Sequence, residues 1–151
     1  TRTELSKDGA GEVRVGWLAD GKHFYAAVEP FHGDKLTVHM PAGDGPWQRV
    51  VIDEAIKEGH ALACADLAGL GRDQIVAGWR MPNGGGRVGI NLYMPADESG
   101  ARWEKVSVDD NNMACEDLLV ADLNGDGKPD IVAAGRKTQN LKIYWNKGAK
   151  N

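Results

Sequence analysis

The stretch DLNGDGKPD at residues 122–130, followed at once by IVAAG at residues 131–135, decides the fold of this chain. It places oxygen-bearing side chains at positions 1, 3, 5 and 9 of a nine-residue loop, with glycines at positions 4 and 6. Hard cations such as Ca²⁺ take about six to eight oxygen ligands, and a loop that offers one at every second residue can wrap around them. The predicted ligands are the side chains of Asp122, Asn124, Asp126 and Asp130 and the backbone carbonyl of Lys128.

This loop differs from an EF-hand, which begins in the same way. An EF-hand requires a bidentate Glu at position 12 and a helix after the loop. Position 12 here is Ala133, which lies in a run of β-branched and small residues typical of a buried strand. The sequence therefore predicts a calcium loop that joins two β-strands.

The composition is that of one ordinary globular domain. The chain has 151 residues, of which 42% are hydrophobic and 26% charged, so it can bury a core of normal size. The net charge of −4 and the lack of a basic stripe argue against nucleic-acid binding, and no apolar run approaches the length of a membrane span. Cys64 and Cys115 fit either two buried free thiols or a disulfide between repeats.

The calcium loop has a second copy earlier in the chain. A shift of 56 residues superposes residues 66–77 (DLAGLGRDQIVA) on residues 122–133 (DLNGDGKPDIVA), and the same shift takes Trp47 to Trp103. One register that satisfies so many positions indicates a true repeat. Repeats of about this length form propeller blades or solenoid units.

Each repeat contains short runs rich in Val, Ile, Leu, Ala, Tyr and Trp, separated by Gly, Pro, Asn, Asp and Ser. Four strands in a unit of about 50 residues is the composition of a propeller blade. Residues 2–5 precede the first unit much as residues 50–52 precede the second, so they resemble the fourth strand of another blade. The other predicted strands are 13–17, 24–29, 36–40 and 47–52, then 61–66, 75–80, 88–94 and 103–108, then 117–122, 131–135 and 141–146.

We therefore predict an all-β fold of β-propeller blades in a single segment spanning residues 1–151. The three blades cover about residues 9–52, 61–108 and 117–146, and residues 1–6 form a closing strand. Three blades cannot close a ring, and an open wedge exposes two apolar blade faces and a strand edge. The expected partners are therefore other blades, supplied by a parent protein or by a second copy that completes six blades.

Residues 122–135, together with the tryptophans that begin the fourth strands, resemble the FG-GAP/VCBS family of calcium-loop β-propeller repeats. The resemblance covers nearly the whole chain and is strongest in the third repeat, because the second repeat keeps the glycines but loses the ligands. It implies a propeller, usually of seven blades and often secreted, hence an extracellular or periplasmic location. Family members serve as lectins or adhesion modules, and some carry enzymatic sites. More distantly, residues 26–33 and 59–66 look like the propeller part of fungal aldos-2-ulose dehydratase-type proteins.

Propeller geometry predicts where the remaining polar residues gather. If the calcium loop lies at one end of the blades, called the bottom end, then the connections between second and third strands and between blades lie at the opposite, top end. Histidine, glutamate and arginine around a channel mouth can bind sugars, carboxylates or a second metal. Each such side chain can also be a solvated surface charge or the cap of a turn. The top-end candidates are Glu29, His32, His60, Arg80, Glu116 and Arg136.

Three functions are compatible with these features. The first is a calcium-stabilised propeller module that binds a glycan or a protein, or acts as a scaffold, within a larger or oligomeric assembly. The second is a metal-dependent sugar lyase or dehydratase with its metal at the top end. The third is a purely structural piece without a ligand. We expect the calcium to be structural, because the second repeat carries Asp66, Ala68, Leu70 and Gln74 at the ligand positions and cannot bind a metal there.

Overall fold

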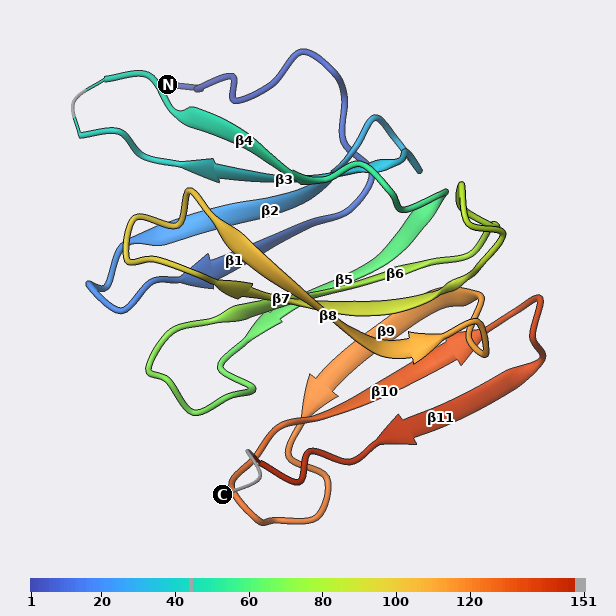
Figure 1. Ribbon diagram of the computed structural model, residues 1–151. Helices are drawn as coiled ribbons and strands as arrows, with labels where there is room; N and C mark the ends of the chain where they lie inside the picture. Colours follow the sequence, from blue (N-terminus) through green and yellow to red (C-terminus); the bar gives the residue numbers. More distant parts are fainter. Residues whose placement is uncertain (44, 149–151) are drawn as a thin grey trace.

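The computed structural model describes residues 1–43 and 45–148, which form three antiparallel β-sheets stacked in chain order (Figure 1). We call the sheets blades 1, 2 and 3. None of these residues belongs to a helix, so no helix among them could span a membrane. Blade 1 contains β1 (Val13–Trp17), β2 (His23–Glu29), β3 (Lys35–Met40) and β4 (Gln48–Asp53); blade 2 contains β5 (Gly59–Ala65), β6 (Gln74–Trp79), β7 (Gly89–Pro95) and β8 (Trp103–Asp110); blade 3 contains β9 (Cys115–Ala121), β10 (Asp130–Gly135) and β11 (Asn140–Tyr144).

The predicted all-β fold of propeller blades is confirmed. The eleven strands predicted within the three blades are all present, each within two residues of its predicted bounds. Residues 1–6 form no strand in the chain by itself. Their predicted role as a closing strand for another blade, and the single-segment organisation, stay predictions.

Alternation along the strands divides the core into two layers between blades. In β6, Ile75 packs with the buried residues of blade 1, whereas Val76 packs with those of blade 3. All six residues of β6 are buried, because a strand inside a stack of sheets has no solvent-facing side. Phe24 and Leu36 of blade 1 complete the first layer, in which both are fully buried.

The fourth strands of blades 1 and 2 share a β-bulge at the same place. The register of β4 shifts opposite the step from Leu36 to Thr37, and the register of β8 shifts opposite the step from Ile90 to Asn91. A bulge inserts one extra residue and so re-aims the side chains that follow it. In both strands the residue after the bulge is an aspartate.

These two aspartates, Asp53 and Asp109, reach from one blade into the next. Oδ2 of Asp53 accepts hydrogen bonds from Tyr93 Oη at 2.6 Å and Lys105 Nζ at 3.0 Å. Oδ2 of Asp109 accepts them from Tyr144 Oη at 2.7 Å and Lys142 Nζ at 3.3 Å. We call each of these sets an inter-blade carboxylate contact.

The hydrogen bonds determine the charge state of Asp53. Burial alone raises the pKa of this carboxyl, but the bonds donated by Tyr93, by the backbone of Ala55 and by Lys105 outweigh that effect and hold its pKa below the ordinary value. Burial and the neighbouring Asp53 charge raise the pKa of Tyr93, which therefore stays a neutral donor. The contact thus joins an ionised aspartate to a protonated tyrosine.

The stack ends in two open apolar faces. Leu141 and Ile143 on β11 are 73% and 44% exposed, whereas the residues in the same repeat positions of blade 1, Leu36 and Val38, are fully buried. At the other end, Val13, Val15 and Trp17 on β1 are about half exposed. Each open face therefore corresponds to a surface that a neighbouring blade covers inside the stack.

Candidate functional site

Four of the predicted top-end residues lie together. Arg80 Nη1 donates to Glu116 Oε1 at 2.8 Å, and its Nη2 lies 3.5 Å from Nδ1 of His32. His60 Nδ1 donates to the backbone carbonyl of Glu116 at 2.7 Å. Residues of all three blades therefore meet around the guanidinium of Arg80. Glu58, which the sequence did not single out, completes the group by accepting from Arg80 Nε at 3.0 Å.

Aromatic and imidazole rings extend this group outward. The rings of His32 and His60 lie 4.3 Å apart, and His32 stacks on Phe31 with 3.8 Å between ring centroids. Phe31 is 68% exposed, so its outer surface is free to contact a ligand. An exposed aromatic beside charged groups suits a ring with one apolar side, such as a sugar.

A cavity of about 400 Å³ adjoins the cluster, and Arg136 is among the residues that line it. Arg80 in this cavity is balanced by Glu58 and Glu116, whereas Arg136 and Lys137 pair with no carboxylate among the described residues. The cavity therefore carries unbalanced positive charge. Its lining residues are Arg80, Met81, Glu116, Arg136, Lys137 and Gln139.

Backbone strain gathers at the same end of the molecule. His32, Glu58 and Gln139 have φ angles of 48°, 49° and 51°, in the left-handed region that non-glycine residues seldom adopt. Such a conformation costs about 1 kcal/mol or more and persists where the surrounding contacts fix it. All three residues contact or line the Arg80 cluster and its cavity, so strain and charge coincide there.

Glu29 lies apart from this group, in contrast to the prediction. It is 1% exposed, and its carboxylate accepts from Arg49 Nε at 2.8 Å and lies 2.9 Å from His39 Nε2. The reason is the alternation along β2, which directs Glu29 to the same face as Tyr25 and Ala27. The sequence placed Glu29 at the end of a strand, but it did not show on which face of the sheet the Glu29 side chain lies.

The predicted calcium loop is held by hydrogen bonds from its own backbone. The Asp122 carboxylate accepts from the N–H groups of Gly125, Asp126 and Gly127, and Asp130 accepts from Leu123 and Asn146. Asp122, Asn124, Asp126 and Lys128 are exposed, whereas Asp130 is fully buried. The backbone N–H of Lys128, which donates to Asp126, lowers the pKa of the Asp126 carboxyl and keeps it ionised.

The second repeat folds its loop in the same way without these ligands. The Asp66 carboxylate accepts from the N–H groups of Leu70 and Gly71, as Asp122 does from Asp126 and Gly127. The glycine pair of each loop has φ between 67° and 78°. The first aspartate and the two glycines therefore shape the turn, and the additional acidic residues of loop 122–130 have another role.

The donor chemistry of loop 122–130 fits a hard cation, since exposed carboxylate and amide oxygens are the ligands that Ca²⁺ prefers. Each carboxylate oxygen has two lone pairs, so one that accepts a backbone N–H can still ligate. In the conformation seen, no three His, Cys, Asp or Glu side chains of the described residues converge on one metal position. Ligation by this loop thus requires its acidic side chains to move closer together.

Both cysteines are free, and they lie in different layers of the core. Cys64 packs in the layer between blades 1 and 2, and Cys115 packs in the layer between blades 2 and 3. Burial raises the pKa of each thiol to about 12. Neither has the ionised sulfur that a nucleophile or a metal ligand needs.

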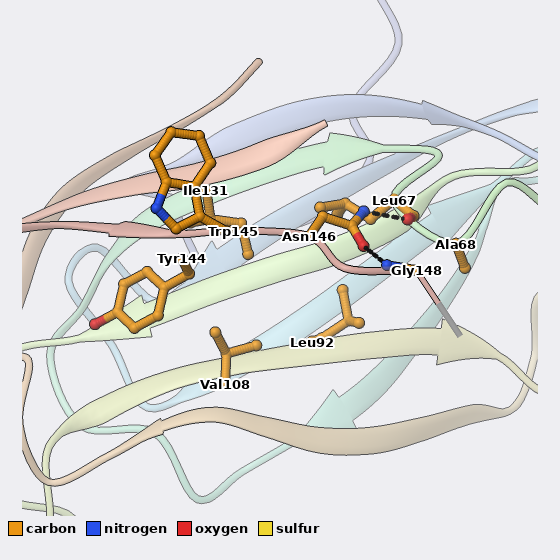
Figure 2. Close-up of a pocket in the computed structure, with 9 residues that line it drawn as sticks. All are labelled: Leu67, Ala68, Leu92, Val108, Ile131, Tyr144, Trp145, Asn146 and Gly148. Carbon is orange, nitrogen blue, oxygen red and sulfur yellow. Dashed lines mark hydrogen bonds between the residues drawn. The ribbon is translucent and has the colours of Figure 1, made fainter. Parts of the chain in front are cut away.

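A second cavity, of about 310 Å³, lies between blades 2 and 3, and its lining is mainly apolar. Figure 2 shows Leu92 and Val108 facing Tyr144 across it, with Asn146 bonded to Leu67 at one end. In blade 2 the corresponding place is filled by Trp103, which contacts Phe24 of blade 1 at 5.4 Å between ring centroids. The cavity therefore marks where a fourth strand of blade 3 would pack.

The fold and the loop geometry define a propeller-type repeat protein. Residues 116–137, which include loop 122–130 and most of the flanking strands, match the family model of the FG-GAP repeat. No curated protein matches the chain. The chain thus carries an FG-GAP repeat within a fold of β-propeller blades, as the sequence resemblance implied.

Proposed function

We propose that this chain is a propeller-type binding module whose top end binds an acidic glycan. The observation that carries the proposal is the cavity beside Arg80, in which Arg136 and Lys137 have no carboxylate partner within residues 1–43 and 45–148. Its volume of about 400 Å³ lies within the usual range of small-molecule sites. Arginine binds carboxylates in a bidentate manner, and Phe31 offers a stacking surface beyond His32.

Calcium is proposed as a structural ion of loop 122–130. Three aspartates, Asp122, Asp126 and Asp130, lie in one short loop, and a divalent cation offsets the repulsion between carboxylate charges. The loop is exposed, and its side chains must turn to ligate, so we expect weak binding that requires about millimolar calcium. Such concentrations occur outside cells, in agreement with the proposed extracellular or periplasmic location.

Assembly with further blades is proposed from the two open faces. Contiguous apolar surface of this kind marks an interaction site, and the free edge of β11 can pair with another strand. The partner is either a second copy of the chain or the remaining blades of a parent protein.

The enzymatic alternative gains no support from the geometry. The rings of His32 and His60 lie against each other at a tilt of 41°, and the Nδ1 atom of each already has a partner. Neither is joined by Glu29, which is buried in blade 1. Among the described residues, no three His, Cys, Asp or Glu side chains converge on a metal position, so the metal site that such a lyase needs is not assembled.

Arg136→Gln is expected to weaken uronate binding at least tenfold, because it removes a charge-assisted hydrogen bond worth about 1.5–3 kcal/mol. Calorimetric titration with oligogalacturonate measures this, and galactose serves as the neutral ligand. Arg102→Gln is the control variant, since Arg102 is exposed and forms its ion pair with Asp97. Equal affinity for the charged and neutral sugars would contradict the proposed ligand class, and a complete lack of sugar binding would indicate a protein ligand.

Calcium at about ten times its dissociation constant should stabilise the fold by about 1.4 kcal/mol, which corresponds to roughly 3–5 °C in melting temperature. The measurement is thermal unfolding with calcium chloride and with EDTA. Asp126→Asn should abolish the increase, whereas Asp66→Asn, in the corresponding loop of blade 2, should leave it intact. The calcium proposal is contradicted if calcium does not change the melting temperature of the unmodified chain.

The full chain is expected to sediment as a dimer or a larger species. Leu141→Asp should reduce it to a monomer, because the charge would lie on the open face of blade 3. Leu70→Asp is the control, since Leu70 is 52% exposed but lies on a bottom-end loop. A compact monomer for the unmodified chain at about 100 μM would contradict self-assembly.

A further inference from the structure

The open face of blade 1 contains a buried polar cluster that the proposed ligand site does not use. Glu29, Thr37 and His39 are at most 3% exposed, and Arg49 on β4 reaches past β3 to donate to Glu29 on β2. Nδ1 of His39 is buried without a hydrogen-bond partner among the described residues. Buried polar atoms are nearly always paired, so an unpaired one calls for an explanation.

Strand pairing shows which residues of blade 2 occupy the same positions. In each blade the bulge lies opposite the step that follows one third-strand residue, Leu36 in blade 1 and Ile90 in blade 2. Three residues after Leu36 is His39, and three residues after Ile90 is Tyr93. On the fourth strands, the residue opposite His39 is Arg49, and the residue opposite Tyr93 is Lys105. His39 and Arg49 are therefore the counterparts of Tyr93 and Lys105.

Tyr93 and Lys105 together bind Asp53, the last residue of the preceding blade's fourth strand. By the same geometry, His39 and Arg49 face the position of a carboxylate from a blade that precedes blade 1. Nη2 of Arg49 lies 3.2 Å from Oδ2 of Asp8 as well as 2.6 Å from Oε2 of Glu29. By distance both are ion pairs, although neither contact of Nη2 has the angles of a hydrogen bond.

The sequence before Asp8 has the pattern of a fourth strand. An apolar residue stands three positions before the aspartate in residues 50–53, in residues 106–109 and again in residues 5–8. Leu5 and Ser6 line a cavity of about 180 Å³ together with Tyr25, Ala27 and His39. Residues 5–8 therefore already lie against the open face of blade 1, as β4 lies against blade 2.

We propose that residues 5–8 are the end of a fourth strand belonging to the preceding blade, and that Asp8, His39 and Arg49 form a third inter-blade carboxylate contact. The partner that completes this blade is β9–β11 of a second copy, whose β11 edge is free and whose Leu141 and Ile143 occupy interface positions. This part of the inference rests on the proposed assembly. The Asp8 side chain is 62% exposed in the single chain, against 5% for Asp53, and the second copy would bury it.

The test compares Asp8→Asn with the full unmodified chain. Sedimentation equilibrium should show a dimer dissociation constant at least tenfold larger for Asp8→Asn, because a buried hydrogen-bonded charge contributes more than an exposed one. Asp20→Asn is the control, since Asp20 is an exposed aspartate that pairs with Lys22 in a hairpin turn. Its dissociation constant should equal that of the unmodified chain.

The outcomes separate this inference from the proposed assembly. If Leu141→Asp dissociates the dimer and Asp8→Asn does not, the assembly stands and the carboxylate contact is wrong. If the unmodified chain is a monomer, both the proposed self-assembly and the proposal that a second copy completes the blade are wrong. The contact itself is then decided by ¹⁵N relaxation of residues 5–8. The contact is supported if the backbone of residues 5–8 is ordered in the unmodified chain and becomes mobile in Asp8→Asn. It is overturned if the backbone of these residues is equally mobile in the two chains.

Discussion

The rest of the structure depends on one interaction, the contact between an aspartate at the end of each fourth strand and the next blade. Asp53 and Asp109 are 8% and 7% exposed, and each accepts from a tyrosine and a lysine of the following blade. Hydrogen bonds to a charged group are worth about 1.5–3 kcal/mol, and an unpaired buried charge costs more than that. The hydrophobic effect between two sheets is non-directional, whereas this contact joins specific atoms of neighbouring blades and so specifies their relative position.

Fixed stacking explains why residues of neighbouring blades meet at both ends of the blades. At the top end His60 binds the backbone of Glu116, its counterpart in the next blade, and at the bottom end Trp17 N–H donates to Asp73 in the loop before β6. The top-end cluster is thus assembled from equivalent connections of neighbouring blades, so its geometry follows from the stack. The bottom-end loops are shaped independently by Asp66 and Asp122, which makes it possible for one repeat to change its ligands without disturbing the fold.

Short runs rich in Val, Ile, Leu, Ala, Tyr and Trp between turn residues were enough to predict the strands, and the 56-residue shift predicted the blades. The same reasoning placed His32, His60, Arg80, Glu116 and Arg136 at one end, because loop position depends only on strand order. It failed for Glu29, whose burial depends on the face to which the end of β2 turns. It could not find the carboxylate contacts, since Asp53 and Tyr93 are 40 residues apart and a bulge brings them together. Glu58 and Lys137 were missed because nothing in their local sequence distinguishes them from surface charges.

A double-mutant cycle on Asp53 and Tyr93 tests the central role of the carboxylate contact most directly. The free energy of unfolding in urea is measured for the unmodified chain, Asp53→Asn, Tyr93→Phe and the double variant. The two side chains are hydrogen-bonded to each other and both are buried. The loss of unfolding free energy in the double variant should therefore differ from the sum of the losses in the two single variants by about 1–2 kcal/mol. Effects that add to within about 0.3 kcal/mol would show that the two residues act independently, and would contradict the account.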